Sequence, residues 1–290
     1  MSYEGKRVSV WRYLAVTGIF LCLILGMRIQ AQAAKSMEIQ SCQISSSDHS
    51  KVEVKASGAA IMAGTDGNYY LVALLPYEKQ VTKKSIVAGT KAQKSLVTYR
   101  VNLNLKSRSS ILYRKFAIAV KKNNKYQIVS NFQYITNPES LAPVRKAFPK
   151  AASKKGLHIK PTMISDAEDL GIKHAAVNIC LDTFIATSGQ KNASSAYPYT
   201  YQGRQYWFLK SGCNEVDRQT KELARSNVIV SGILLLRQYG GGKVLVPPNA
   251  RNTGKNYYGI NTMDQEGLET LEALMHFLGD RYMNSNGKYG

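Results

Sequence analysis

Hydrophobic and polar residues alternate with a period of two between residues 36 and 136. Clear examples are Lys51–Ala56, Leu96–Asn104 and Lys115–Val120, and turn residues separate the runs. Lys122–Lys125 is predicted to join two of these strands as a hairpin. Several short strands with no helical stretch between them predict a β-sandwich over this segment.

The pattern changes after residue 136. Residues 137–160 contain prolines and a basic run, which predicts a linker. Over residues 161–290, strands alternate with helices, and the apolar strands Lys173–Leu181 and Val228–Leu236 are typical of parallel strands covered on both faces. Long loops after each strand favour the first β/α units of a TIM-like barrel, and no GxGxxG motif supports a dinucleotide fold. We expect the chain to stop inside that barrel.

Two helices of this second part have sequence signals at their starts. Ser165 and Glu168 have the spacing of a capping box, which predicts a short helix ending at Gly171. Asp264 is predicted to cap a longer helix with an apolar stripe. The stripe consists of Leu268, Leu271, Leu274, Met275 and Leu278.

The N-terminus carries basic residues, a short apolar run and the small-x-small pattern Ala31-Gln32-Ala33. These features predict a signal peptide over residues 1–33 and a secreted or cell-surface protein. An uncleaved anchor is the alternative, and it would be the protein's contact with a membrane. The apolar run is shorter than the roughly 20 residues that span a bilayer.

The formal net charge of the chain is +20. Such a balance suits anionic partners, including acidic polysaccharide and cell-wall glycan. The lysines are scattered through turns, so an ordinary solvated surface is the alternative. We predict no nucleic-acid partner because no binding motif accompanies the charge.

Cysteine and histidine positions do not predict a metal or redox site. Cys42, Cys180 and Cys213 follow the signal segment, without CxxC spacing, and the four histidines are isolated. We therefore predict no metal site and no cofactor.

Three polar residues are candidates for a binding site at the ends of the two predicted strands. Asn178 and Asp182 share one parity of the first strand, and Arg237 follows the second. In the predicted barrel, Asn178 and Asp182 would point inward, and Asp182 and Arg237 would lie at its C-terminal mouth. The alternatives are an interior polar role for Asn178, a turn cap for Asp182 and a surface position for Arg237.

An aromatic segment in the first long loop is a second candidate. Gln202-Gly203 is predicted to form the turn of a small hairpin between two aromatic arms. Rings beside polar groups suit sugars, which stack their C–H faces on aromatic planes. Packing of the hairpin as a lid is the alternative. The candidates are Tyr199, Tyr201, Tyr206 and Trp207, with Tyr257 and Asn261 in the second loop.

Seven blocks of the sequence also carry a family resemblance: Ala117–Val120, Tyr134–Glu139, Gly171–Ile179, Tyr199–Tyr206, Ile233–Leu235, Asn256–Tyr258 and Leu271–Tyr282. They resemble a family of secreted bacterial proteins catalogued as a domain of unknown function. That family is placed among the glycoside-hydrolase-like barrels, behind an N-terminal β-sandwich.

The resemblance implies an Asn-Glu strand end carrying a catalytic acid/base and a later glutamate as nucleophile. Neither glutamate is present in this chain, so no catalytic residue is assigned. We expect a secreted glycoside hydrolase-like protein that acts on polysaccharide, in a piece that lacks its catalytic carboxylates. The alternative is a non-catalytic carbohydrate-binding or cell-surface protein.

Overall fold

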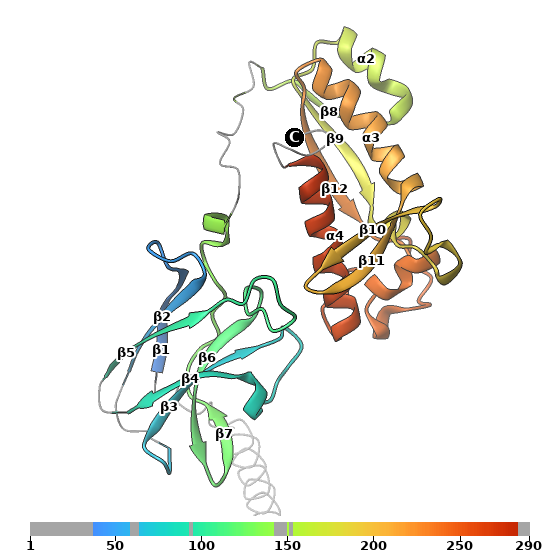
Figure 1. Ribbon diagram of the computed structural model, residues 1–290. Coiled ribbons are helices and arrows are strands. Elements are labelled where there is room, and N and C mark those ends of the chain that lie inside the picture. The colour runs from blue at the N-terminus through green and yellow to red at the C-terminus, as the bar shows by residue number, and fades with distance from the viewer. Residues whose placement is uncertain (1–36, 59–63, 93–94, 142–149, 151–152, 284–290) are drawn as a thin grey trace, which may run out of the picture.

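The computed structural model describes residues 37–58, 64–92, 95–141, 150 and 153–283, which form two units (Figure 1). The predicted signal peptide lies outside the described residues. No helix within the described ranges combines the length and the hydropathy that a membrane crossing requires.

The first unit consists of two antiparallel sheets. One has the strand order β1-β2-β5 and the other β4-β3-β6-β7. The strands are β1 (Met37–Ile44), β2 (Lys51–Gly58), β3 (Asn68–Leu74), β4 (Ile86–Lys91), β5 (Leu96–Asn102), β6 (Lys115–Lys122) and β7 (Lys125–Ile128). Alternate side chains of both sheets enter one core, which includes Val54, Tyr69, Leu71, Tyr99 and Phe116.

The second unit contains a parallel sheet and three helices. The sheet has the order β12-β9-β8. Its strands are β8 (Gly156–His158), β9 (His174–Cys180) and β12 (Ile229–Leu235), and the helices are α2 (Ile164–Asp169), α3 (Lys210–Arg225) and α4 (Gln265–Tyr282). A separate hairpin is formed by β10 (Ala196–Tyr201) and β11 (Arg204–Leu209). Short 3-10 turns occupy Lys83–Ser85, Pro138–Leu141, Pro161–Met163, Leu181–Phe184, Ser188–Gln190, Gly240–Leu245 and Pro248–Ala250.

The predicted fold class, which ends in the first units of a TIM-like barrel, is wrong. The strands form separate sheets of two to four strands, and none of these sheets closes within the described residues. Among the described residues, helices cover one face of the parallel sheet, where Ala175 and Val177 pack beneath α2 and α3 (Figure 1). Asn178 on the other face is exposed, and Ile233 of the edge strand β12 is 41% exposed. The apolar run of β12 therefore does not indicate a strand covered on both faces.

The strand β8 lies inside the segment predicted as a linker. Its three residues pair in parallel with the start of β9, from Gly156 opposite His174 to His158 opposite Ala176. A strand of this length has no measurable periodicity, so the sequence pattern could not reveal it.

Both predicted hairpin turns are confirmed. Asn123 and Asn124 connect β6 to β7 with φ values of 49° and 60°. Gln202 and Gly203 connect β10 to β11 with φ values of 47° and 75°. Two consecutive left-handed residues match the twist of the flanking strands, and Asn and Gly adopt this conformation at low cost.

The two predicted helix starts differ in outcome. Asp264 caps α4 as predicted, because its Oδ1 accepts a 2.8 Å hydrogen bond from the Gly267 amide. The capping box of α2 is wrong, since Met163 is the N-cap residue and makes no side-chain cap bond. Ser165 is the second residue of that helix, so its hydroxyl cannot act as the cap.

A buried ion pair joins α3 to α4. Arg281 of α4 donates from Nε to Asp217 of α3 at 2.9 Å and also from Nη2, and Tyr282 donates to the same carboxylate at 2.8 Å. The side chains of Arg281 and Asp217 are only 11% and 8% exposed. Removing one member of such a pair leaves the other charge buried and uncompensated.

We predict that Asp217→Ala lowers the free energy of unfolding by about 3–5 kcal/mol, measured by urea denaturation. The matched control is Arg218→Ala, which removes the exposed pair with Glu215 on the same helix. That change should cost less than about 0.5 kcal/mol. Equal losses for the two variants would contradict the role given to the buried pair.

Candidate functional site

The ends of β9 and β12 are held together by Asp182 and Arg237. Arg237 donates to Asp182 from its backbone amide at 3.1 Å, from Nε at 3.3 Å and from Nη2 at 3.0 Å. The carboxylate is almost fully buried, with 2% of its side chain exposed, while 35% of the Arg237 side chain reaches solvent. Asp182 therefore fixes a cation at the surface of the sheet edge.

Strand register explains this meeting. Leu235 is opposite Cys180 in the parallel ladder, so two further residues along each chain bring Arg237 beside Asp182. The segment Gly240–Leu245 closes over the pair from the other side. A Cβ atom at Gly242 would lie only 2.4 Å from the Cβ of Asp182, so a larger residue there would displace the loop.

The guanidinium of Arg237 has a fixed orientation. Its Nε and Nη2 face the carboxylate, and in the described part of the chain no hydrogen bond engages Nη1. The Arg237 guanidinium carbon also lies 5.3 Å from the ring centre of Tyr239, a cation–π distance. Its hydrogen bond with Asp182 raises the pKa of Arg237 further above its ordinary value, so the charge persists at all working pH values.

A cleft of about 490 Å³ opens beside Arg237, and we call it the tyrosine cleft. The residues that line it are Arg237, Gln238, Tyr239, Asn252, Gly254, Lys255, Asn256, Tyr257 and Tyr258. Tyr239 and Tyr257 are 66% and 55% exposed, which is unusual for large aromatic side chains. The lining combines aromatic rings, side-chain amides and two cations.

Specific hydrogen bonds hold the loop that forms the far wall of the tyrosine cleft. The Gln238 side chain donates to Asn252 Oδ1 at 2.6 Å and accepts from the Asn252 amide at 2.8 Å. The Tyr258 amide donates to the Leu236 carbonyl at 2.9 Å. These bonds fasten both ends of residues 252–258 to the segment after β12, so the cleft is formed before any ligand arrives.

The aromatic hairpin lies elsewhere. Tyr199 contacts Phe277 of α4 at 5.4 Å between ring centres and donates to Asp280 at 2.6 Å. The ring centre of Tyr201 lies 4.6 Å from that of His276 on the same helix, and Tyr206 is buried. Trp207 is half-buried on β11. These contacts correspond to the packing alternative for the hairpin rings.

The three remaining predicted site residues lie in different environments. Tyr257 lines the tyrosine cleft, and Asn178 is exposed on the uncovered face of the sheet. Asn261 is fully buried, donating to Val244 and Asp264 and accepting from the Met263 amide. Its amide therefore holds the start of α4 and does not reach a ligand.

Sequence reasoning missed most of the tyrosine cleft. Tyr239, Lys255 and Asn256 were outside the predicted set, as were Gln238 and Asn252. The available signal was a long loop after β12 that carries tyrosines among glycines and asparagines. Loops of this length between regular elements often have a binding role.

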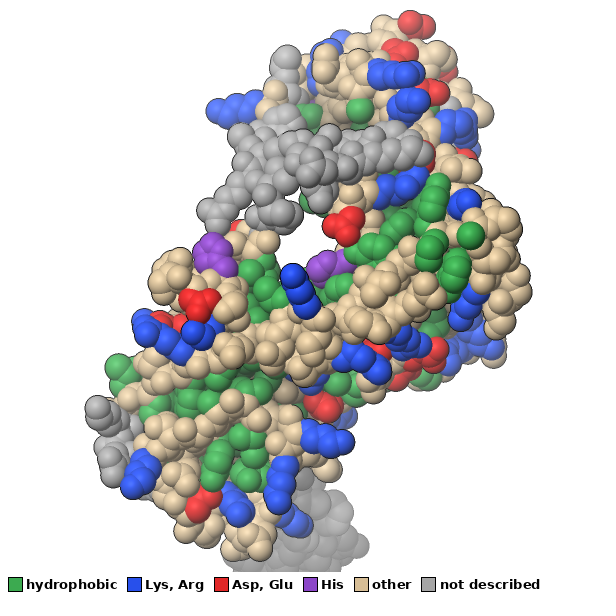
Figure 2. Space-filling model, viewed as in Figure 1, with side chains coloured by type: hydrophobic (Ala, Val, Ile, Leu, Met, Phe, Trp, Pro, Cys, Tyr) green, Lys and Arg blue, Asp and Glu red, His purple; other side chains and the backbone are tan. Residues whose placement is uncertain are grey.

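Basic side chains are spread over both units in the face shown in Figure 2 and do not gather in one patch. Within the described ranges, no group of three or more His, Cys, Asp or Glu side chains is placed to hold a metal ion. The electrostatics of the tyrosine cleft therefore depend on Arg237 and Lys255.

One known protein family matches the part of the chain that contains the second unit. Residues 147–290 match the model of a family of unknown function, DUF5722. We call the unit that contains this match the DUF5722 domain. The predicted resemblance to a family of unknown function is confirmed to this extent. No curated protein matches the chain.

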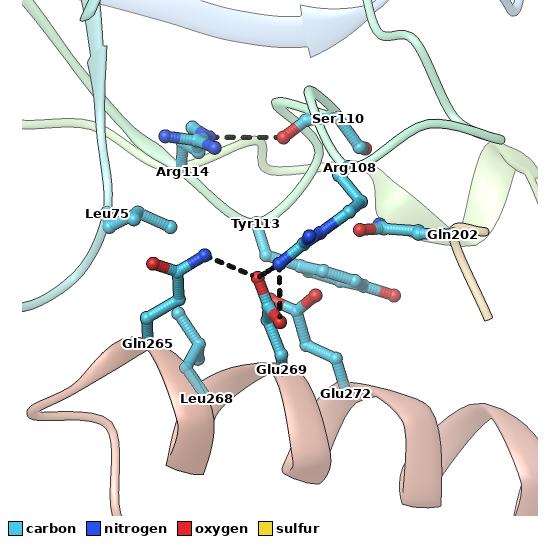
Figure 3. Close-up of a pocket in the computed structure, with 10 residues that line it drawn as sticks. All are labelled: Leu75, Arg108, Ser110, Tyr113, Arg114, Gln202, Gln265, Leu268, Glu269 and Glu272. Carbon is cyan, nitrogen blue, oxygen red and sulfur yellow. Dashed lines mark hydrogen bonds and ion pairs between the residues drawn. The ribbon is translucent and has the colours of Figure 1, made fainter. Parts of the chain in front are cut away.

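A small cavity also lies between the first unit and the DUF5722 domain. Figure 3 shows Arg108 reaching from the first unit to Glu269 on α4, with Glu272 one helical turn further along. Tyr113 of the first unit makes a second connection, with its hydroxyl 3.1 Å from Nε2 of His276. The cavity measures about 50 Å³. Small-molecule sites measure about 300–1,000 Å³, so this cavity has room for water and not for a sugar.

Glu272 nevertheless has unusual electrostatics at this interface. Burial raises the pKa of its carboxyl from the ordinary 4.5 to about 7, Glu269 adds to the rise, and Arg114 and Tyr201 oppose it. The protonated form is favoured in the folded state. Its stabilising contribution is therefore complete below about pH 4.5 and is lost as the pH rises through about 7.

We predict that, relative to Glu272→Gln, the wild-type protein loses free energy of unfolding as the pH rises from 4.5 to 8. The difference should reach about 1–2 kcal/mol once solvent screening is allowed for. Urea unfolding at several pH values measures it, and Glu266→Gln in the exposed first turn of α4 is the control. A stability difference that does not change with pH would contradict the assignment.

Proposed function

We propose that the DUF5722 domain binds an acidic glycan in the tyrosine cleft. The observation that carries the proposal is the position of Arg237. Asp182 anchors this cation at the cleft surface, and the exposed rings of Tyr239 and Tyr257 line the same cleft.

The lining suits a sugar on three counts. Exposed tyrosine rings provide flat apolar surfaces for the C–H faces of a sugar ring. Asn256 and the Gln238–Asn252 pair provide amides for its hydroxyl groups. The hydrogen bonds that hold the loop reduce the entropy that binding would otherwise cost.

The preference for an acidic sugar follows from charge. Arg237 and Lys255 line the cleft, and its nine lining residues include no Asp or Glu. A guanidinium with donors free of the anchoring carboxylate matches the geometry of a ligand carboxylate or sulfate. The net charge of +20 would also accelerate the approach of an anionic polymer.

Glycoside hydrolysis remains a prediction for the whole protein. The reaction needs two carboxyl groups placed across the scissile bond. Asp182 is engaged by Arg237, and the tyrosine cleft is lined by cations, amides, tyrosines and a glycine. Binding is therefore the function that the cleft supports best. Action outside the cell, as in the secreted bacterial family that the sequence resembles, is part of the proposal and depends on the predicted signal peptide.

We predict that Tyr257→Ala weakens binding of polygalacturonate about tenfold, as expected for the loss of a central aromatic contact. Isothermal titration calorimetry measures the affinity. The matched control is Tyr134→Ala, which removes a 46% exposed tyrosine from the first unit and should leave binding unchanged.

A second control separates the cleft from net charge. Lys84 lines a pocket of the first unit together with Lys51, Arg100 and Arg114. If charge alone drives binding, Lys84→Ala and Lys255→Ala will weaken it equally, and that result would contradict the proposal. We expect only Lys255→Ala to weaken binding, by about threefold.

A further inference from the structure

Arg237 lines a second pocket on its other side, which we call the strand-end pocket. This pocket measures about 430 Å³. Its residues are His158, Ile159, Lys160, Asn178, Cys180, Thr183, Ser211, Gly212, Glu215, Val216, Gln219 and Arg237. Apart from Arg237, they come from the end of β8, from β9 and the turn after it, and from the part of α3 between Ser211 and Gln219. Arg237 is the residue common to this pocket and the tyrosine cleft.

The two pockets differ in chemistry. Each pocket has a lysine beside the shared Arg237, namely Lys255 in the tyrosine cleft and Lys160 in the strand-end pocket. The tyrosine cleft adds exposed rings, whereas the strand-end pocket adds the exposed amide of Asn178 and the exposed carboxylate of Glu215. Gln219, nearly fully buried, donates to Glu215 Oε1 at 3.2 Å and helps to place that carboxylate. An amide and a carboxylate suit the hydroxyl groups of a sugar residue, and Lys160 and Arg237 in the same lining suit its acidic group.

We propose that the ligand runs across Arg237 from the tyrosine cleft into the strand-end pocket. The site would then select an oligosaccharide with an acidic group at Arg237 over an acidic monosaccharide. This inference rests on the proposed function and adds the minimum length of the ligand. Each pocket alone falls within the size range of small-molecule sites, about 300–1,000 Å³.

The anchoring of Arg237 is what makes a continuous site feasible. Its Nε and Nη2 are committed to Asp182, so the guanidinium cannot swing into either pocket and block it. Nη1 lies outside the pair with Asp182, so its donors are available to a ligand at the residue that the two pockets share. A single acidic group bound there would leave the flanking sugar residues to occupy one pocket each.

Cys180 provides a direct report on the strand-end pocket. Its thiol is half-buried and lines that pocket, whereas Cys42 and Cys213 are buried. Burial raises the pKa of the Cys180 thiol, so alkylation is compared at one fixed pH. The test measures its alkylation rate by peptide mass spectrometry with saturating tetragalacturonate and, separately, with saturating galacturonic acid.

We expect tetragalacturonate to slow Cys180 alkylation at least fivefold and the monosaccharide to have little effect. Asn178→Ala should lower the affinity for the tetramer about fivefold more than that for the monomer, the effect of one lost hydrogen bond. Ser211→Trp, which places a large ring in the exposed mouth of the strand-end pocket, should reproduce the selective loss for the tetramer.

The outcomes separate the two proposals. Tyr257-dependent binding of the tetramer with unchanged Cys180 reactivity and no Asn178 effect would overturn the extended site and leave the proposed function intact. No binding of either ligand would overturn both. Protection of Cys180 that survives Tyr257→Ala without loss of affinity would place the ligand in the strand-end pocket alone, and it would also overturn the extended site.

Discussion

The buried hydrogen bonds between Asp182 and Arg237 are the constraint on which the binding surface depends. Asp182 and Arg237 each lie two residues beyond paired positions of β9 and β12, and their hydrogen bonds tie the loops after both strands to each other. Gly242 permits a third segment to pack directly on Asp182. A carboxylate with 2% of its side chain exposed would be costly without a partner. The same bonds leave one side of the guanidinium facing solvent. Under the proposed function, the same arginine both ties the two loops together and faces the ligand.

The DUF5722 domain uses its aromatic residues in two separate ways. Rings of the β10–β11 hairpin pack on α4 together with Phe208 and Phe277, and hydrogen bonds from Tyr199 and Tyr282 satisfy polar groups at the edge of that cluster. Tyr239 and Tyr257 instead remain exposed around Arg237. The first unit joins the domain through Arg108 and Tyr113, beside a cavity too small for a sugar. The aromatic cluster and the interface therefore share no lining residue with the tyrosine cleft.

Local signals in the sequence predicted local structure well. The turns at Asn123 and Gly203 and the cap at Asp264 depend on residues within a few positions of each other. Strand parity also brought Asp182 and Arg237 together, although they meet at the end of an open sheet and not at the predicted barrel mouth. The barrel prediction was wrong because apolar strands with long loops also occur in an open sheet, and only tertiary packing leaves Ile233 exposed. The side on which the hairpin packs was not predictable either, since it depends on α4, which follows about 60–80 residues later in the sequence. The hydrogen bonds between Gln238 and Asn252 join loop residues 14 positions apart. No periodic pattern in the sequence indicates such a contact.

In the proposed site, the segment after β12, and not the aromatic hairpin, contacts the ligand. Hydrogen–deuterium exchange of the protein with and without saturating tetragalacturonate tests it most directly, because backbone amides in a ligand-covered loop exchange more slowly. The account predicts slower exchange in peptides covering 236–239 and 252–258, with no change in peptides covering 196–209. Slower exchange confined to the hairpin peptides, with 236–239 and 252–258 unchanged, would contradict the account.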